Sequence, residues 1–273
     1  MYEENERRVI ESSELPILKS QLIDDFRKIG LKEGDNVVVH SSLSKIGWIP
    51  GKAVPVIEAL MEIITEKGTL VMPTHTSDNS DPKNWQHPPV PEAWKPIIRE
   101  HMPAYDPRIS PTRGMGIIVD TFLHFLGVIR SNHPSLSFAA WGKYAELIAA
   151  DHPLTPSFGI NSPLGRLYEL KGKIMLLGVD HLNNSSLHIA ENIAGYPGAK
   201  LELLGSAIMK DGKRIWATWE EKEFIDEDFL EIGKAYEESI NYKRGNVGYA
   251  TTALLNQADL IDFAVEWMLK NRK

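Results

Sequence analysis

The order of apolar and polar positions predicts a chain that starts with strands and helices in alternation. Residues 36–40 (NVVVH) and 69–72 (TLVM) are short, continuous, largely apolar runs of the kind found in buried strands. Between them, residues 53–65 carry apolar side chains at helical spacing, with Gly51 before and Gly68 after. A strand, a helix and a second strand in this order predict a right-handed crossover between two parallel strands.

Later segments add helices, another buried strand and an antiparallel hairpin. Residues 173–177 form a further continuous apolar run and precede a polar turn. The dipeptide Asp211-Gly212 separates residues 201–209 from 213–219, and it is a strong hairpin signal. The remaining periodic segments predict helices near residues 14–29, 116–125, 143–150, 162–170, 226–239 and 256–270.

Between residues 73 and 111 the high proline content predicts irregular structure instead of regular helices and strands. This segment contains nine prolines, and the two tryptophans and one tyrosine among them favour an ordered excursion over a disordered linker. Residues 1–12 are polar, and we expect them to be frayed. No repeat or domain boundary is evident, so we predict a single mixed α/β (α+β) domain over residues 1–273, with residues 73–111 as an ordered insertion.

Composition narrows the function. A net charge of −7 argues against nucleic acid as the main partner and allows a cationic substrate. No apolar run approaches the roughly 20 residues that span a bilayer. The charged N-terminus has no apolar signal core, so we expect a cytoplasmic protein without a membrane partner. The absence of cysteine excludes disulfides, thiolate-bound zinc and a cysteine nucleophile, so acyl transfer would be direct or would use serine or threonine.

The turn after the strand at residues 173–177 carries the densest chemistry. Its sequence, GVDHLNNSSLHIAE, places two histidines, two asparagines and two serines within residues 181–188. Such groups are costly to bury without partners, and a strand-to-helix turn is a common place for an active site. His188 suits a general base near neutral pH, although a hydrogen-bonded core histidine is the alternative. His181 and His188 are seven residues apart, which does not match helical metal-ligand spacing and disfavours a metal-dependent hydrolase.

Three further segments could bind charged groups. The run from His40 to Ser44 (HSSLS) offers hydroxyls and backbone N–H groups to an anion, whereas a simple helix cap would need one serine. Arg113 and Arg130 each stand beside a hydroxyl residue, which suits either a phosphate or an ordinary ion pair. The acidic stretch 220–231 could be a solvated surface, could orient His188, or could receive a cationic substrate.

Taken together, these motifs resemble the aminoglycoside N3-acetyltransferase family. The segments HSSLSKIGW, PTRGMG, RSNHP, SPLGRLYEL and KGKIMLLGVDHLNNSSLHIAE occur in the family's order and spacing, and the resemblance extends from about residue 15 to the C-terminus. It implies the family's own mixed α/β fold and an acetyl-CoA-dependent acyltransferase without a metal. It also implies acetylation of the 3-amino group of a 2-deoxystreptamine aminoglycoside, a reaction of antibiotic resistance.

The resemblance also implies roles for single residues. His188 matches the catalytic histidine, and a carboxylate partner is expected in the acidic stretch, with Glu221 and Glu223 as candidates. The other implied catalytic residues shape the turn near the thioester: Asn184, Ser185 and Ser186. Residues expected on the cofactor side are His40, Ser41, Ser42, Leu43, Ser44, Thr112, Arg113, Arg130, Ser131 and His133. Residues expected to contact the substrate are His75, Asp180 and His181.

The sequence departs from the family pattern at three positions. Asp180 stands where glycine is usual, Ser185 where threonine is usual, and Lys52 where a second glycine is frequent. The acceptor amine is therefore open: the chain could acetylate a different metabolite amine, or bind acyl-CoA without transferring the acyl group. Whether it forms a homo-oligomer is also open.

Overall fold

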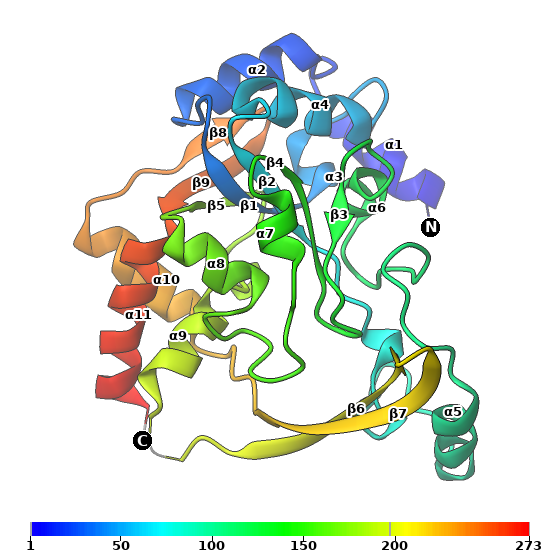
Figure 1. Ribbon diagram of the computed structural model, residues 1–273. Coiled ribbons are helices and arrows are strands. Elements are labelled where there is room, and N and C mark those ends of the chain that lie inside the picture. Colours follow the sequence, from blue (N-terminus) through cyan, green and yellow to red (C-terminus); the bar gives the residue numbers. More distant parts are fainter. Residues whose placement is uncertain (1, 197, 273) are drawn as a thin grey trace.

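A mixed sheet of seven strands runs through the centre of the protein (Figure 1). The computed structural model describes residues 2–196 and 198–272, and the strand order is β3-β4-β2-β1-β5-β9-β8. The strands are β1 (Asn36–Ser41), β2 (Thr69–Pro73), β3 (Ile129–Arg130), β4 (Phe138–Gly142), β5 (Lys173–Leu177), β8 (Gly245–Val247) and β9 (Ala250–Asn256). Strand β1 is parallel to β2 and β5, and the outer pairs are antiparallel.

The predicted parallel unit is confirmed. Strand β1 leads through α3 (Leu43–Ile46) and α4 (Ala53–Ile64) into β2, and Val38 pairs in register with Val71. Strands β4 and β9 were not predicted. Both pair antiparallel with the parallel core, and the short β4 is interrupted by alanine and glycine, so the sequence of β4 carries little strand signal.

Each face of the sheet has its own hydrophobic core, because successive side chains of a strand point to opposite faces. Val37 and Val39 pack in the core that α2 (Lys19–Lys28), α4 and α6 (Ile117–Phe122) complete. Val38 packs in the other core. The helices on that second face are α7 (Ala145–Ala149), α8 (Pro163–Glu169), α9 (Leu187–Ala194), α10 (Phe229–Ser239) and α11 (Gln257–Asn271).

The N-terminal segment is a helix where we predicted frayed residues. Helix α1 (Tyr2–Ser12) lies beside α3, and Met1 lies outside the described residues. The Trp48 backbone N–H donates to the Ser13 hydroxyl at 2.9 Å, which ties the end of the helix to the body of the protein. This contact is made with a residue 35 positions away, so the polar composition of the segment could not predict it.

The proline-rich excursion and the predicted hairpin pack against each other. The hairpin, β6 (Leu201–Lys210) and β7 (Lys213–Lys222), extends away from the central sheet towards α5 (Lys95–His101) in Figure 1. The Tyr105 backbone N–H donates to Ala207 O at 3.0 Å, and Arg214 donates to Met102 O at 3.0 Å. The excursion also contains three 3₁₀ turns: η1 (Ser77–Asn79), η2 (Pro82–Asn84) and η3 (Glu92–Trp94).

The helices of the described chain are short. Across residues 2–196 and 198–272, none combines the length and the apolar character that crossing a membrane would require.

Candidate active site

His188 lies in the first turn of α9, and its carboxylate partner is on the same helix. The imidazole Nδ1 lies 2.5 Å from Glu191 Oε2. Residues three apart on a helix are neighbours on its surface, so this pair follows from local geometry once the helix forms. The partner is therefore Glu191 and not either of the carboxylates expected from the sequence.

Glu221 and Glu223 are placed elsewhere. Glu221 is buried and accepts a hydrogen bond from the Ser157 backbone N–H at 2.7 Å. Glu223 follows β7 and donates its backbone N–H to Lys200 O at 2.9 Å. The structure thus pairs neither carboxylate with His188. The three-residue spacing of His188 and Glu191 was the signal in the sequence for the contact that the structure shows.

Two segments far away in the sequence hold the Glu191 carboxylate. Its Oε1 accepts from Arg272 Nη1 at 2.6 Å and from the Ile225 backbone N–H at 3.1 Å. Burial acts to lower the pKa of Arg272, but its hydrogen bonds to Asp228 and Glu191 outweigh burial and raise that pKa. The guanidinium thus stays charged and compensates the buried carboxylate. No local sequence pattern identified Arg272.

Three phenylalanine rings set the orientation of the His188 imidazole. Phe158 stacks on it at a centroid distance of 4.8 Å and an interplanar angle of 29°. Phe224 and Phe229 lie at 5.0 Å and 4.8 Å. With Nδ1–H donated to Glu191, the other ring nitrogen, Nε2, carries the lone pair. The imidazole is therefore arranged to accept a proton at Nε2.

His188 lines a cavity of about 280 Å³, which we call the inner cavity. Its polar wall includes His40, His75, Asn184 and Asp226. Burial lowers the pKa of His40 to about 4. Burial, followed by the neighbouring His40 and His188, lowers the pKa of His75 to about 3. Both rings are therefore neutral at pH 7, and they add no positive charge to a cavity that would receive a cationic amine.

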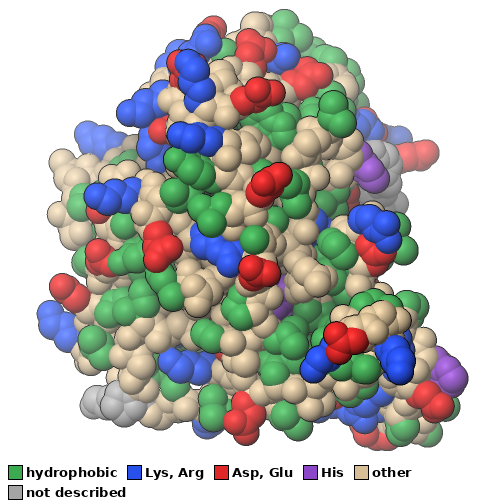
Figure 2. Space-filling view, in the orientation of Figure 1, with side chains coloured by type: hydrophobic (Ala, Val, Ile, Leu, Met, Phe, Trp, Pro, Cys, Tyr) green, Lys and Arg blue, Asp and Glu red, His purple; other side chains and the backbone are tan. Residues whose placement is uncertain are grey.

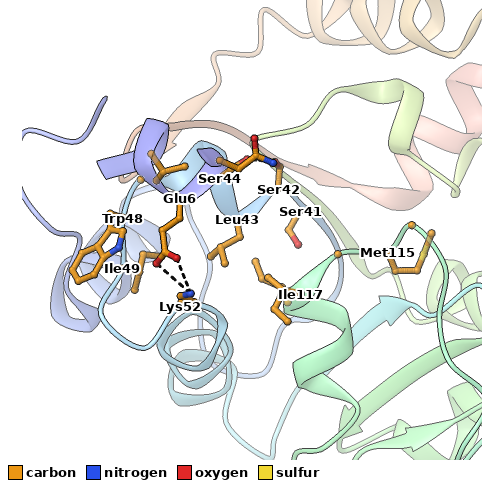
Figure 3. A pocket seen from close by; sticks show the side chains of 16 residues that line it. Glu6, Ser41, Ser42, Leu43, Ser44, Trp48, Ile49, Lys52, Met115 and Ile117 are labelled. Atoms are coloured by element: carbon orange, nitrogen blue, oxygen red, sulfur yellow. Dashed lines mark hydrogen bonds and ion pairs between the residues drawn. The ribbon is translucent and has the colours of Figure 1, made fainter. Parts of the chain in front are cut away.

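A second, larger pocket of about 420 Å³, the outer pocket, is shown in Figure 3 and shares part of its wall with the inner cavity. Ser41, Gly114 and Met115 line both. The rest of its wall is mostly apolar and comes from residues 42–44, 47–49, 52 and 116–118 together with Asn5, Glu6 and Val9 of α1. A long, slender molecule could lie in the outer pocket with its end beside His188.

The turn before α9 is built around a second buried histidine. His181 is fully buried, its Nε2 lies 2.9 Å from Glu237 Oε1, and its Nδ1 lies 3.3 Å from Asn184 Nδ2. His181 does not line the inner cavity, so the structure does not support the substrate contact that we expected for it. Asp180, which was also assigned to the substrate, accepts from the Leu182 backbone N–H at 3.0 Å and caps the short turn η4 (His181–Asn183).

The three residues expected near the thioester separate into two groups. Asn184 and Ser185 line the inner cavity. Ser186 is fully buried, and its hydroxyl lies 3.1 Å from Gln257 Nε2, so it supports the turn from behind. Because Asn184 Oδ1 accepts from the Ser186 backbone N–H at 3.2 Å, the Ser185 hydroxyl is the group of these three that is open to a reacting molecule.

The residues that we expected on the cofactor side also fall into two groups, those that line one of the two pockets and those that line neither. Ser41, Ser42, Leu43 and Ser44 line the outer pocket, and His40 lines the inner cavity. The other five residues of that prediction line neither, and their side chains are engaged within the protein: Thr112, Arg113, Arg130, Ser131 and His133.

The arginines and their neighbours hold the excursion in place. Arg130 is buried and donates to Thr74 O at 2.6 Å and to Ser137 Oγ at 3.1 Å. Arg113 forms an ion pair with Asp78 and donates to His87 O at 2.8 Å. These contacts satisfy the guanidinium groups, so the structure does not support the cofactor contact that we expected from them.

The described residues contain no cluster of three or more histidine, cysteine, aspartate or glutamate side chains placed to hold a metal ion.

Known sequences similar to this chain belong to one family. The family model for aminoglycoside 3-N-acetyltransferase matches residues 38–269. The SPbeta prophage-derived aminoglycoside N(3')-acetyltransferase-like protein YokD of Bacillus subtilis (strain 168) is 45% identical over 266 residues, which cover 97% of both chains. Aminoglycoside N(3)-acetyltransferase VII of Streptomyces paromomycinus is 32% identical, with 97% of this chain and 96% of the relative covered.

Solved structures agree with the sequences. The crystal structure of YokD matches with a TM-score of 0.94 over 97% of this chain and 98% of that chain. A structure of AAC-IIIb in binary complex with CoASH matches with a TM-score of 0.83 at 28% identity, over 94% of this chain and 97% of that chain. The residues that the family model matches include most of the sheet, α9 with His188 and Glu191, the wall of the inner cavity, and the wall of the outer pocket except for its α1 residues. The chain belongs to the aminoglycoside 3-N-acetyltransferase family.

Proposed function

We propose that the protein transfers the acetyl group of acetyl-CoA to the 3-amino group of a 2-deoxystreptamine aminoglycoside, with His188 as the general base. Membership of the family makes it an acyltransferase. The observation that carries the finer proposal is the His188–Glu191 pair at the wall of the inner cavity, which shares wall residues with the outer pocket. One site for the amine and one for the donor thus meet beside a base.

The outer pocket suits the acyl donor. Its mostly apolar wall fits a pantetheine arm, and the hydroxyls of residues 41, 42 and 44 offer hydrogen bonds to the amides of that arm. AAC-IIIb, which shares the fold, has been solved with CoASH. With the thioester beside Ser41, where the outer pocket meets the inner cavity, the acetyl group would be close to His188.

The chemistry follows from the state of the His188 ring. His188 Nε2 takes a proton from the substrate ammonium, and the amine nitrogen attacks the acetyl carbon. The new N–C bond forms, the C–S bond breaks, and the departing sulfur takes the proton from His188 and leaves as a thiol. His188 Nε2 then takes the second proton that the nitrogen loses on becoming an amide, and releases it to solvent. Glu191 stabilises the imidazolium in between. The Ser185 hydroxyl lies at the cavity wall, where it can hydrogen-bond to the developing oxyanion.

The inner cavity suits a cationic acceptor. Asp226 lines it, and the neighbouring His40 and His75 are neutral because burial lowers their pKa values to about 4 and about 3. Figure 2 shows acidic and basic side chains interspersed over the face that it presents. Attraction of the cation therefore depends on carboxylates at the site, such as Asp226, more than on a broad acidic surface on that face.

Replacement of His188 by alanine tests the proposal. Without the base, kcat should fall by roughly a hundredfold or more, while the affinity for CoA should stay within about twofold. Thiol release with acetyl-CoA and a panel of aminoglycosides measures the first, and titration calorimetry measures the second. The matched control is His101→Ala, which removes an exposed histidine on α5. Full turnover by the His188→Ala variant would remove the base from the mechanism.

The acceptor needs its own test. Wild-type turnover on aminoglycosides, with the product acetylated at the 3-amino group by mass spectrometry and NMR, is the expected result. Binding of CoA with no turnover on any aminoglycoside would contradict the proposed acceptor.

A further inference from the structure

An ion pair stands in the wall of the outer pocket. Lys52 Nζ lies 3.2 Å from both carboxylate oxygens of Glu6, and their side chains are 45% and 32% exposed. Figure 3 shows this pair on the opposite side of the pocket from Met115, with Leu43 and Ile117 between. Lys52 is basic and Glu6 is acidic, and the other side chains of the described wall are uncharged.

The position of the pair matches the anionic part of the acyl donor. Ser41 and Met115 also line the inner cavity, so a thioester would lie at this end of the outer pocket. The pantetheine arm of the same molecule would then occupy the apolar middle of the pocket. Its diphosphate would come out on the side of Lys52 and Glu6. A phosphate is attracted by an ammonium group and repelled by a carboxylate, so the two side chains act on it in opposite directions.

Helix α1, which supplies Glu6, buries little of its surface against the rest of the protein. Of its described side chains none is fully buried, and Glu6 and Val9 are the half-buried ones, both facing the pocket. An isolated helix of fewer than about 12–15 residues is marginally stable in water, so α1 depends on these contacts. The chain is anchored just after it, where Ile17 N–H donates to Trp48 O at 2.8 Å. Glu6 can therefore leave Lys52 without opening a hydrophobic core.

We propose that Lys52 is a binding residue for the phosphates of the acyl donor and that Glu6 competes with them for it. The inference rests on the proposed function, because it takes an acyl-CoA as the donor. Binding exchanges the Glu6–Lys52 ion pair for a phosphate–Lys52 pair and turns the Glu6 carboxylate away from the donor. The pair thus makes the pocket selective for donors that carry phosphates. The phosphates of such a donor pair with the Lys52 ammonium, whereas a phosphate-free thioester leaves the Glu6–Lys52 ion pair intact.

Two substitutions and two ligands test the exchange. Lys52→Gln removes the charge and keeps a side chain of similar length at a residue whose φ is 57°. It should weaken CoA binding about fivefold to tenfold, a range set by a charge-assisted contact that is partly exposed to solvent. Pantetheine, which has no phosphate, should bind both proteins equally. Glu6→Gln removes the competitor and should strengthen CoA binding roughly threefold, again without changing pantetheine binding.

A matched control uses an ion pair outside the pocket. Lys19 lies 3.2 Å from Glu58 and 3.1 Å from Glu62, and its side chain is 37% exposed against 45% for Lys52. Lys19→Gln therefore removes a comparable lysine outside the pocket, and CoA affinity should not change. All dissociation constants are measured by titration calorimetry at one salt concentration. Equal CoA affinity in wild type and Lys52→Gln, or an equal loss for CoA and pantetheine, would overturn the inference. If wild type binds neither ligand, the proposed function fails instead.

Discussion

Replacement of Glu191 by glutamine should disable His188 by changing its tautomer. Glu191 Oε1 accepts from two donors, Arg272 Nη1 at 2.6 Å and Ile225 N–H at 3.1 Å, while Oε2 faces His188 Nδ1 at 2.5 Å. In a glutamine the single oxygen stays where two donors point at it, so the NH₂ group faces Nδ1. Nδ1 must then accept a hydrogen bond, which moves the ring proton to Nε2 and removes the lone pair that takes the substrate proton.

The expected loss of kcat can be worked out from the free energy that keeping the proton on Nδ1 would cost. If the proton stayed on Nδ1, the Nδ1–H group would point at the NH₂ group of the glutamine, and neither donor would have an acceptor. An unsatisfied buried donor costs about 1–3 kcal/mol. The variant also loses the carboxylate that stabilises the imidazolium, an interaction of about 1.5–3 kcal/mol. Since about 1.4 kcal/mol corresponds to a factor of ten, kcat should fall by roughly a hundredfold to a thousandfold.

The assay combines kinetics with direct detection of the tautomer. Thiol release at saturating acetyl-CoA gives kcat, calorimetry should show unchanged CoA affinity, and ¹⁵N NMR of the ring should show the proton on Nε2 of His188. Glu221→Gln is the competing test, because Glu221 accepts from Ser157 N–H and a glutamine oxygen can still do so. The reasoning is refuted if Glu191→Gln keeps more than a tenth of the wild-type kcat, or if the loss appears with Glu221→Gln instead.

Two further predictions concern the acceptor and acid stability. Asp226→Asn should raise KM for a cationic aminoglycoside roughly threefold with little change in kcat, since one exposed carboxylate contributes modestly; an unchanged KM at low salt would exclude Asp226 from acceptor binding. Burial lowers the pKa of His40 to about 4 and of His75 to about 3, so the unfolded chain takes up protons that the folded chain does not. Stability should therefore be lost as the pH falls from about 6.5 towards 4, by about 2 kcal/mol per histidine at pH 5. Urea denaturation at pH 7 and pH 5 measures it, and His75→Asn should lose its share of the dependence.

The central strands, the crossover helix, the hairpin and the turn with His188 were predictable because each depends on neighbouring residues. The continuous apolar runs of β1, β2 and β5 have few other stable arrangements than a buried sheet, and Asp211-Gly212 specifies a tight turn by its backbone preferences. The chemistry of His188 was likewise visible in the polar residues that surround it in the sequence. The contact between His188 and Glu191 was predictable in the same way, because the two residues are three positions apart on one helix. The sequence analysis placed the carboxylate in the acidic stretch 220–231 instead.

The tertiary structure decided which polar side chains are available for chemistry. His181, Arg130 and His133 have residue types that suit an active site, yet the fold buries each of them with partners that satisfy it. Arg272 reaches Glu191 across 81 positions of the chain. The state of a titratable group depends on its burial and on its nearest charges, and segments far apart in the sequence supply both. A local pattern can therefore indicate where chemistry gathers, but the packed chain selects the residues that are free to perform it.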